Sequence, residues 1–149
     1  MRRFYWIAAL AFVWTSAAHA AATLVENVDE PTRHPYQEFA TANCTLAGDC
    51  SIVFPAVTVE DTLVLHASCS FALASGNNLV AFASLGVQGG NPRNALPFFI
   101  NSTANGFTDY GINANTYLFY ATGQHPQIDV FGRTAPVQNP ICTISGYTR

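Results

Sequence analysis

The chain has 149 residues, of which half are hydrophobic and a tenth are charged, and its formal net charge is −3. Its six basic residues are all arginines. Because phosphate groups are bound by clustered cations, this composition argues against nucleic acid and against an anionic membrane surface as partners.

The first twenty residues have the pattern of a signal peptide. Arg2 and Arg3 precede an apolar run over residues 4–14, and Ala18-His19-Ala20 has the small-x-small form of a cleavage site. The run is shorter than the roughly 20 apolar residues that span a bilayer. We therefore expect residues 1–20 to be removed. Residues 21–149 are then a single domain, secreted or periplasmic, without a membrane span.

The first part of the remaining chain predicts short strands. Residues 21–40 are acidic and contain two prolines, which excludes a helix, and Ala22–Val28 is a candidate edge strand. Strands are also expected over residues 51–54 and 56–59, separated by Pro55.

Residues 62–74 show the most regular alternation in the chain, which predicts a core strand with one buried face. His66 falls on the polar face, where we expect it to face solvent or a neighbouring strand. The inward row is predicted to contain Leu63, Leu65, Ala67, Cys69, Phe71 and Leu73.

A turn cluster at residues 75–78 predicts a hairpin between this strand and residues 79–87. Pro97 places residues 95–100 at a sheet edge, and Asn105-Gly106 predicts a type I′ turn that pairs residues 98–102 with 107–112. Inward positions of the 79–87 strand are predicted at Leu79, Ala81, Ala83, Leu85 and Val87. Further strands are expected at residues 116–120, 127–131 and 141–147, the last with Cys142 and Ile144 inward.

The sequence shows no helical period, and turn signals recur at intervals typical of sandwiches and barrels. We therefore predict an all-β fold. It is an antiparallel β-sandwich of about eight strands, jelly-roll-like and stabilised by disulfides.

Four cysteines form an even set, as expected in an oxidising compartment, and three pairings are possible. Cys44 with Cys50 is favoured because Gly48-Asp49 supplies a turn between them. Cys69 with Cys142 is favoured because both are predicted on inward faces. Zinc is the less favoured alternative, since the sequence has no C-x2-C spacing and no nearby histidine pair.

Three segments resemble small exported bacterial β-sandwich proteins that have no assigned activity: Ala67-Ser68-Cys69, Tyr117–Gly123 and Cys142–Tyr147. This resemblance implies a jelly-roll fold. It implies no substrate and transfers no functional residue.

Motifs of the common hydrolases and phosphate-binding enzymes are missing from the sequence. His125 is followed closely by Asp129, but this spacing fixes no catalytic geometry. Glu60 and Asp61 are expected in a solvated turn, and acids within residues 26–30 lack the spacing of a calcium loop. We therefore predict no catalytic residue, no metal site, no cofactor and no enzyme activity.

Aromatic residues are the strongest candidates for binding, because tyrosines combine a stacking surface with a polar tip. The candidate ligand-binding residues are Tyr110, Tyr117, Tyr120 and Tyr147. The favoured interpretation, however, is that these rings fill the core, with contact to a ligand or a subunit as the alternative. The neighbours Phe98-Phe99 and Phe119-Tyr120 must each place one ring on either face of a strand, which predicts an external apolar patch.

This patch predicts a non-catalytic exported module with a binding, structural or assembly role, forming a homo-oligomer. The candidate partners are a second copy of the chain, an extracellular protein or a glycan. A lectin-like carbohydrate-binding domain is the alternative function, and a small secreted hydrolase is the least favoured one.

Overall fold

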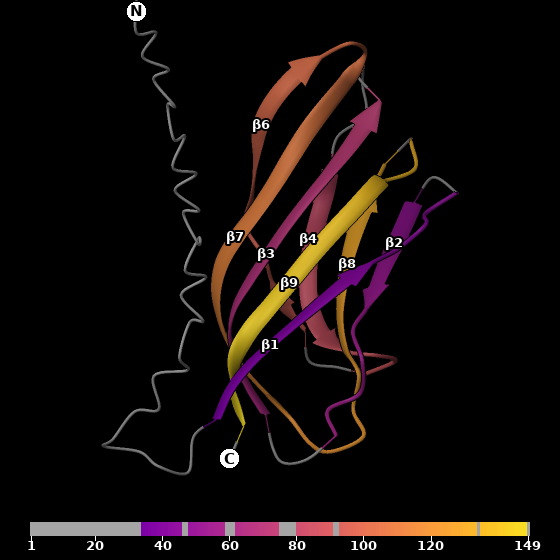
Figure 1. Cartoon of the computed structure of the whole chain (residues 1–149). Helices are drawn as coiled ribbons and strands as arrows, with labels where there is room; N and C mark the ends of the chain where they lie inside the picture. The colour runs from indigo at the N-terminus through magenta and orange to yellow at the C-terminus, as the bar shows by residue number, and fades with distance from the viewer. Residues whose placement is uncertain are drawn as a thin grey trace, which may run out of the picture.

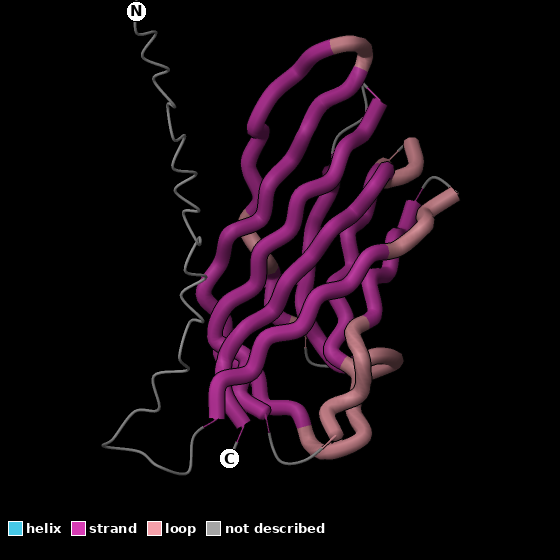
Figure 2. Tube along the Cα trace, viewed as in Figure 1, coloured by secondary structure: helices cyan, strands magenta, loops and turns pink. Residues whose placement is uncertain are grey.

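The computed structural model consists of strands joined by loops, and its described residues contain no helix (Figure 2). The predicted signal peptide, the predicted strand Ala22–Val28, and Glu60 and Asp61 lie outside the described residues. The described ranges are 34–45, 48–58, 62–74, 80–90, 93–133 and 135–148.

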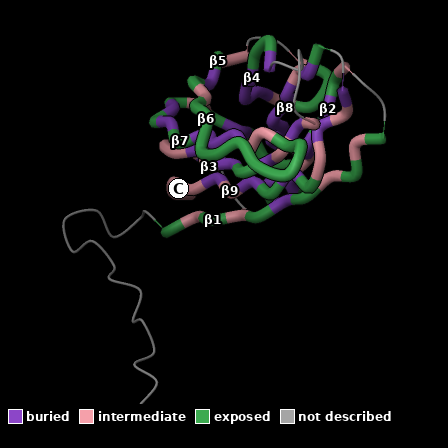
Figure 3. The backbone as a smooth tube through the Cα atoms, turned by 90° about the horizontal axis from the view of Figure 1, so that it is seen from above, coloured by how far each residue is buried: buried purple, intermediate pink, exposed green. Residues whose placement is uncertain are grey.

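Two antiparallel sheets lie one over the other in two layers (Figures 1 and 3). The five-stranded sheet has the order β1 (His34–Thr41), β9 (Gln138–Thr148), β3 (Thr62–Ala74), β7 (Phe107–Tyr120), β6 (Phe98–Ala104). The four-stranded sheet has the order β2 (Gly48–Val53), β8 (Pro126–Gly132), β4 (Val80–Val87), β5 (Asn94–Ala95). This confirms an all-β, sandwich-like fold, with nine strands in the described residues where about eight were expected.

The long alternating segment forms β3 at the centre of the five-stranded sheet (Figure 1). Its predicted inward row is wrong at Leu63 and Leu65, which are half-buried, whereas Thr62 and Val64 are buried. The pairing of β3 with both neighbours shifts between Val64 and His66. Because of this irregularity, the residues before it that face the core are Thr62 and Val64 instead of Leu63 and Leu65. From here on, the prediction is confirmed at Ala67, Cys69, Phe71 and Leu73.

A glycine of the neighbouring strand allows this shift. Gly146 of β9 pairs with Val64, where the two backbones approach closely. A Cβ at Gly146 would overlap the carbonyl oxygen of Leu63 and lie 3.0 Å from the Cα of Val64. A side chain at this position is therefore excluded by backbone atoms, which cannot move aside as a flexible side chain could.

The predicted hairpin between β3 and β4 is wrong, because β4 lies in the other sheet, between β8 and β5. Ala83 and Leu85 are buried as predicted. Ala81 was expected inward but is exposed, since the pairing with β8 shifts between Val80 and Phe82. Of the two remaining predicted positions, Val87 is half-buried and Leu79 lies outside the described residues.

The hairpin at Asn105-Gly106 is confirmed: both turn residues have positive φ, at 53° and 80°, and β6 pairs with β7 across the turn. Residues 116–120 are not a separate strand, since β7 runs without a break over Phe107–Tyr120. The expected strand at 56–59 is also wrong, because its described residues 56–58 form a loop. Pro97 lies where the chain passes from β5 to β6, the edge strands of the two sheets, as its edge position predicted.

Both favoured disulfides are present. Cys69 and Cys142 are directly paired residues of β3 and β9, with their Cα atoms 4.1 Å apart, and both are buried in the core with Ile144. Cys44 and Cys50 connect the segment after β1 to β2. These two bonds suggest folding in an oxidising compartment.

Candidate functional site

The structure separates the four candidate tyrosines into two pairs. Tyr110 and Tyr120 are only 2% and 1% exposed and belong to the core. Tyr110 stacks on Phe71, with ring centroids 5.6 Å apart, and the Tyr120 hydroxyl donates a hydrogen bond to the Gly86 carbonyl of the opposite sheet. These two tyrosines therefore fill the core, which is the interpretation that the sequence favoured for the aromatic residues.

Burial also perturbs the tyrosine hydroxyls in this interior. Desolvation raises the pKa of Tyr36 to about 12, with a smaller contribution from the charge of Glu38. Desolvation likewise raises the pKa of Tyr120, with a smaller contribution from Tyr36. Both phenols therefore stay neutral well above the ordinary tyrosine range.

Tyr117 and Tyr147, in contrast, lie on the outer face of the five-stranded sheet. Four neighbouring strands align Pro35, Tyr147, Leu63 and Phe119 in one cross-strand row. Tyr117 lies two residues from Phe119 on the same face of β7, and these two side chains are 75% and 65% exposed. We call these five residues the apolar row.

The same face carries further exposed apolar side chains away from the apolar row. Phe39 of β1 and Ile141 of β9 are 60% and 50% exposed. The ring of Phe99 lies over Gly111, whose missing Cβ leaves space for it. Exposed apolar side chains are thus found on both edge strands of this sheet, β1 and β6.

Uncharged polar groups fill the middle of this face. His66 hydrogen-bonds the Asn113 side-chain oxygen across β3 and β7, at 2.8 Å, which confirms it as a cross-strand partner. Among the described outward residues of β1, β9, β3 and β7, Asp109 is the only Asp, Glu, Lys or Arg, and it accepts a hydrogen bond from Ser102. This face therefore combines exposed rings with very few charges.

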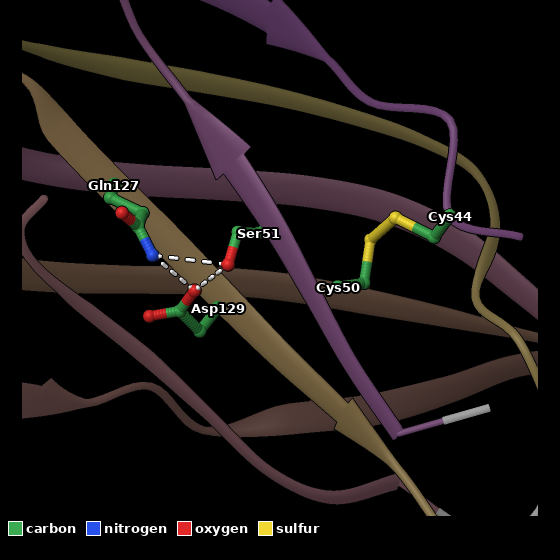
Figure 4. The surroundings of a disulfide bond; sticks show 5 residues. All are labelled: Cys44, Cys50, Ser51, Gln127 and Asp129. Atoms are coloured by element: carbon green, nitrogen blue, oxygen red, sulfur yellow. Dashed lines mark hydrogen bonds between the residues drawn. A yellow bond between two sulfur atoms is a disulfide. The ribbon is translucent and has the colours of Figure 1, made fainter. Parts of the chain in front are cut away.

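The outer face of the four-stranded sheet is different. Asp129 of β8 accepts hydrogen bonds from Ser51 of β2 and from the Gln127 amide (Figure 4). Its second carboxylate oxygen forms an ion pair with Arg93. Asp129 and Gln127 are consequently buried although they point away from the core, and the disulfide Cys44–Cys50 lies on the other side of β2, near the start of that strand (Figure 4).

His125 and Asp129 make separate contacts. The His125 ring nitrogen Nδ1 hydrogen-bonds the Phe54 carbonyl at 3.0 Å, while the Asp129 oxygens are held by the groups described above. Among the described residues, no three His, Cys, Asp or Glu side chains gather as a metal site would require. Within the same ranges, the chain has no helix of the length and apolar character that crossing a membrane demands.

Sequence reasoning missed Phe39, Ile141 and the Asp129 cluster. Both alternate rows of residues 34–41 mix polar and apolar side chains, so periodicity gives no signal for Phe39. Ile141 shares the outward face of β9 with Thr143 and Ser145, so the alternation of that strand already indicated its position. The partners of Asp129 come from β2, β8 and the segment before β5, and their meeting carries no local signal.

Comparison with known proteins found no matching family model, no similar curated protein and no similar solved structure.

Proposed function

We propose that the protein is a non-catalytic exported module that associates with a second copy of itself through the outer face of its five-stranded sheet. The observation that carries this proposal is the exposure of Tyr117, Phe119, Phe39 and Ile141 on a face where one outward residue, Asp109, is charged among those that the structure describes. Interface cores are enriched in aromatic side chains and depleted of charge.

The chemistry of the face favours a second copy over an unrelated partner. Self-pairing brings identical groups close together, so a charged face would repel its own copy. The groups here are aromatic rings and uncharged side chains such as Asn113, Asn115 and Ser145. Amides and hydroxyls both donate and accept hydrogen bonds and can pair with their own kind.

The strand orders support a finer assignment of the fold as a jelly roll. Without β6 they are β1-β9-β3-β7 and β2-β8-β4-β5, which interleave the two halves of the chain as a jelly roll does. β6 is then an additional edge strand.

The leader pattern and the two disulfides support export to the periplasm or beyond the cell, with Ala21 as the mature N-terminus. N-terminal sequencing of the exported protein would check this, and a retained leader would contradict it.

Light scattering of residues 21–149 at micromolar concentration tests the self-association. The mature protein should be larger than a monomer. The double variant Tyr117→Ser/Phe119→Ser should shift it to the monomer, because it removes the most exposed rings of the apolar row. Phe82→Ser is the matched control, since it removes an exposed ring from the opposite sheet. A monomeric wild type, or equal effects of the two changes, would refute the proposal.

A further inference from the structure

A pocket of about 270 Å³ opens on the outer face of the four-stranded sheet. This volume is below the range of roughly 300–1,000 Å³ typical for drug-sized ligands, so it suits a smaller molecule. The residues that line it are Asp49, Ser51, Phe82, Ser84, Arg93, Gln127 and Asp129.

The polar part of the pocket is built on one cross-strand row. Ser51 of β2, Asp129 of β8 and Ser84 of β4 are paired neighbours in this row. Gln127 donates to both Ser51 and Asp129, and Arg93 pairs with Asp129 from the segment before β5. The strands thus hold donors and acceptors in fixed positions along one wall.

Ser84 shows that this wall is incomplete. Its side chain is only 6% exposed, and its hydroxyl has no hydrogen-bond partner among the described residues. A buried hydroxyl without a partner costs free energy comparable to a lost hydrogen bond. Ser84 lines the pocket, but its hydroxyl oxygen is itself buried, so a polar ligand supplies the missing partner only when the Ser84 side chain rotates toward the pocket.

The charges around the pocket argue against an ionic ligand. A cation would meet the Arg93 guanidinium and the Gln127 amide hydrogens, which already occupy the Asp129 oxygens. An anion would meet the carboxylates of Asp49 and Asp129. A neutral ligand with several hydroxyl groups can instead accept from the Arg93 N–H groups that do not pair with Asp129, and donate to Asp49 and serine oxygens.

An aromatic ring forms the apolar wall. Phe82 is half exposed, and it stacks in parallel on Phe131, with centroids 5.5 Å apart. One ring face is therefore covered by Phe131, while Phe82 stays half exposed and contributes to the lining of the pocket. The carbon face of a sugar ring is a natural complement to such a surface, because its hydroxyls project sideways toward polar groups.

We propose that this pocket binds one ring of a neutral saccharide, stacked on Phe82 and hydrogen-bonded to Ser84, Ser51 and Arg93. The site lies on the sheet opposite to the proposed self-association face, so either proposal can fail without the other.

The test uses ¹⁵N-labelled residues 21–149, titrated with millimolar glucose, galactose, mannose or N-acetylglucosamine. At least one of these sugars should shift the amide signals of Ser51, Ser84 and Asp129 in a saturable way. Calcium chloride and sodium sulfate serve as cation and anion probes and should not. The proposal is overturned if none of the four sugars produces saturable shifts there, or if either ion does so instead.

Two variants locate the site. Phe82→Ala should weaken sugar binding about tenfold, which corresponds to loss of one aromatic contact. Ser84→Ala should weaken it about three- to tenfold without loss of folding, because the hydroxyl that it removes has no partner in the free protein. Phe107→Ala, an exposed ring on the other sheet that lies outside the apolar row, is the matched control and should bind as the wild type does. Wild-type affinity in the Phe82 variant would also overturn the proposal.

Discussion

The two sheets present opposite kinds of outer surface. On the five-stranded sheet, large rings such as Tyr117 and Phe119 stand exposed and nearly all polar groups are uncharged. On the four-stranded sheet, the outward residues Gln127 and Asp129 are buried under Arg93 and bonded to one another. Strand alternation alone would make both faces solvent-facing. The side chains that cover each face, and those that stay exposed on it, therefore differ between the two sheets, and the two proposals rest on this difference.

The two disulfides provide the largest expected difference between the sheets. Cys69–Cys142 closes a separation of 73 residues inside the five-stranded sheet, whereas Cys44–Cys50 closes one of 6 residues beside β2. On the chain-entropy model, removing the first by paired alanine substitutions should cost about 4 kcal/mol, and removing the second about 2 kcal/mol. Urea unfolding of both double variants measures this, and equal losses would contradict the different loop lengths.

Gly146→Ala should have the next largest effect, about 3 kcal/mol, because the added Cβ would overlap the Leu63 backbone where β3 and β9 approach closely. Gly90→Ala is the matched control. A Cβ at Gly90 would meet Val87 atoms at 3.4 Å or more, so this change should alter the free energy of unfolding by about 0.5 kcal/mol or less. The comparison is made by urea unfolding, and similar losses at both glycines would show that the close approach does not constrain the sheet.

Substitution of one aspartate on each sheet compares the outer faces of the two sheets directly. Asp129→Asn removes the charge that holds Arg93 and disturbs a buried hydrogen-bonded cluster, which should cost about 2 kcal/mol. Asp109→Asn on the five-stranded sheet disturbs one exposed hydrogen bond to Ser102 and should cost about 0.5 kcal/mol. Thermal unfolding of both variants measures the difference. A larger loss of stability in Asp109→Asn than in Asp129→Asn would contradict the conclusion that the outer face of the four-stranded sheet is the one with buried polar groups.

The smallest expected effect is a dependence of stability on alkaline pH. Burial raises the pKa of Tyr36 to about 12, so the unfolded chain releases this proton at a lower pH than the folded protein does. The contribution is therefore complete below about pH 10 and is lost as the pH rises toward 12. The unfolding temperature should fall over this interval, and less so in Tyr36→Phe. An identical fall in the variant would assign the effect to other groups.

Much of the fold could be predicted, because it follows from local patterns. The alternation in β9, the turn at Asn105-Gly106 and the edge position of Pro97 are each encoded within a few residues. The inward placement of Leu63 was wrong because the shift beside Val64 depends on the approach of Gly146, about eighty residues further along the chain. A break in register leaves no sign in a sequence that continues to alternate.

The candidate site could be predicted only in part. The pairs Phe98-Phe99 and Phe119-Tyr120 correctly indicated one outward ring each, because neighbouring residues of a strand face opposite sides. Periodicity could not separate Tyr110 and Tyr120 in the core from Tyr117 at the surface without knowing which face of β7 meets the other sheet. The pocket of Ser51, Ser84 and Asp129 depends on the order of β2, β8 and β4, which is a property of the topology.

Chemical cross-linking between copies tests the central claim most directly, namely that the five-stranded face mediates self-association. Asn115→Cys places a single free thiol in the middle of that face, and Asp49→Cys places one on the exposed surface of the four-stranded sheet. With a short bismaleimide at micromolar protein concentration, Asn115→Cys should give a covalent dimer and Asp49→Cys should remain monomeric. A dimer from Asp49→Cys with none from Asn115→Cys would contradict the account.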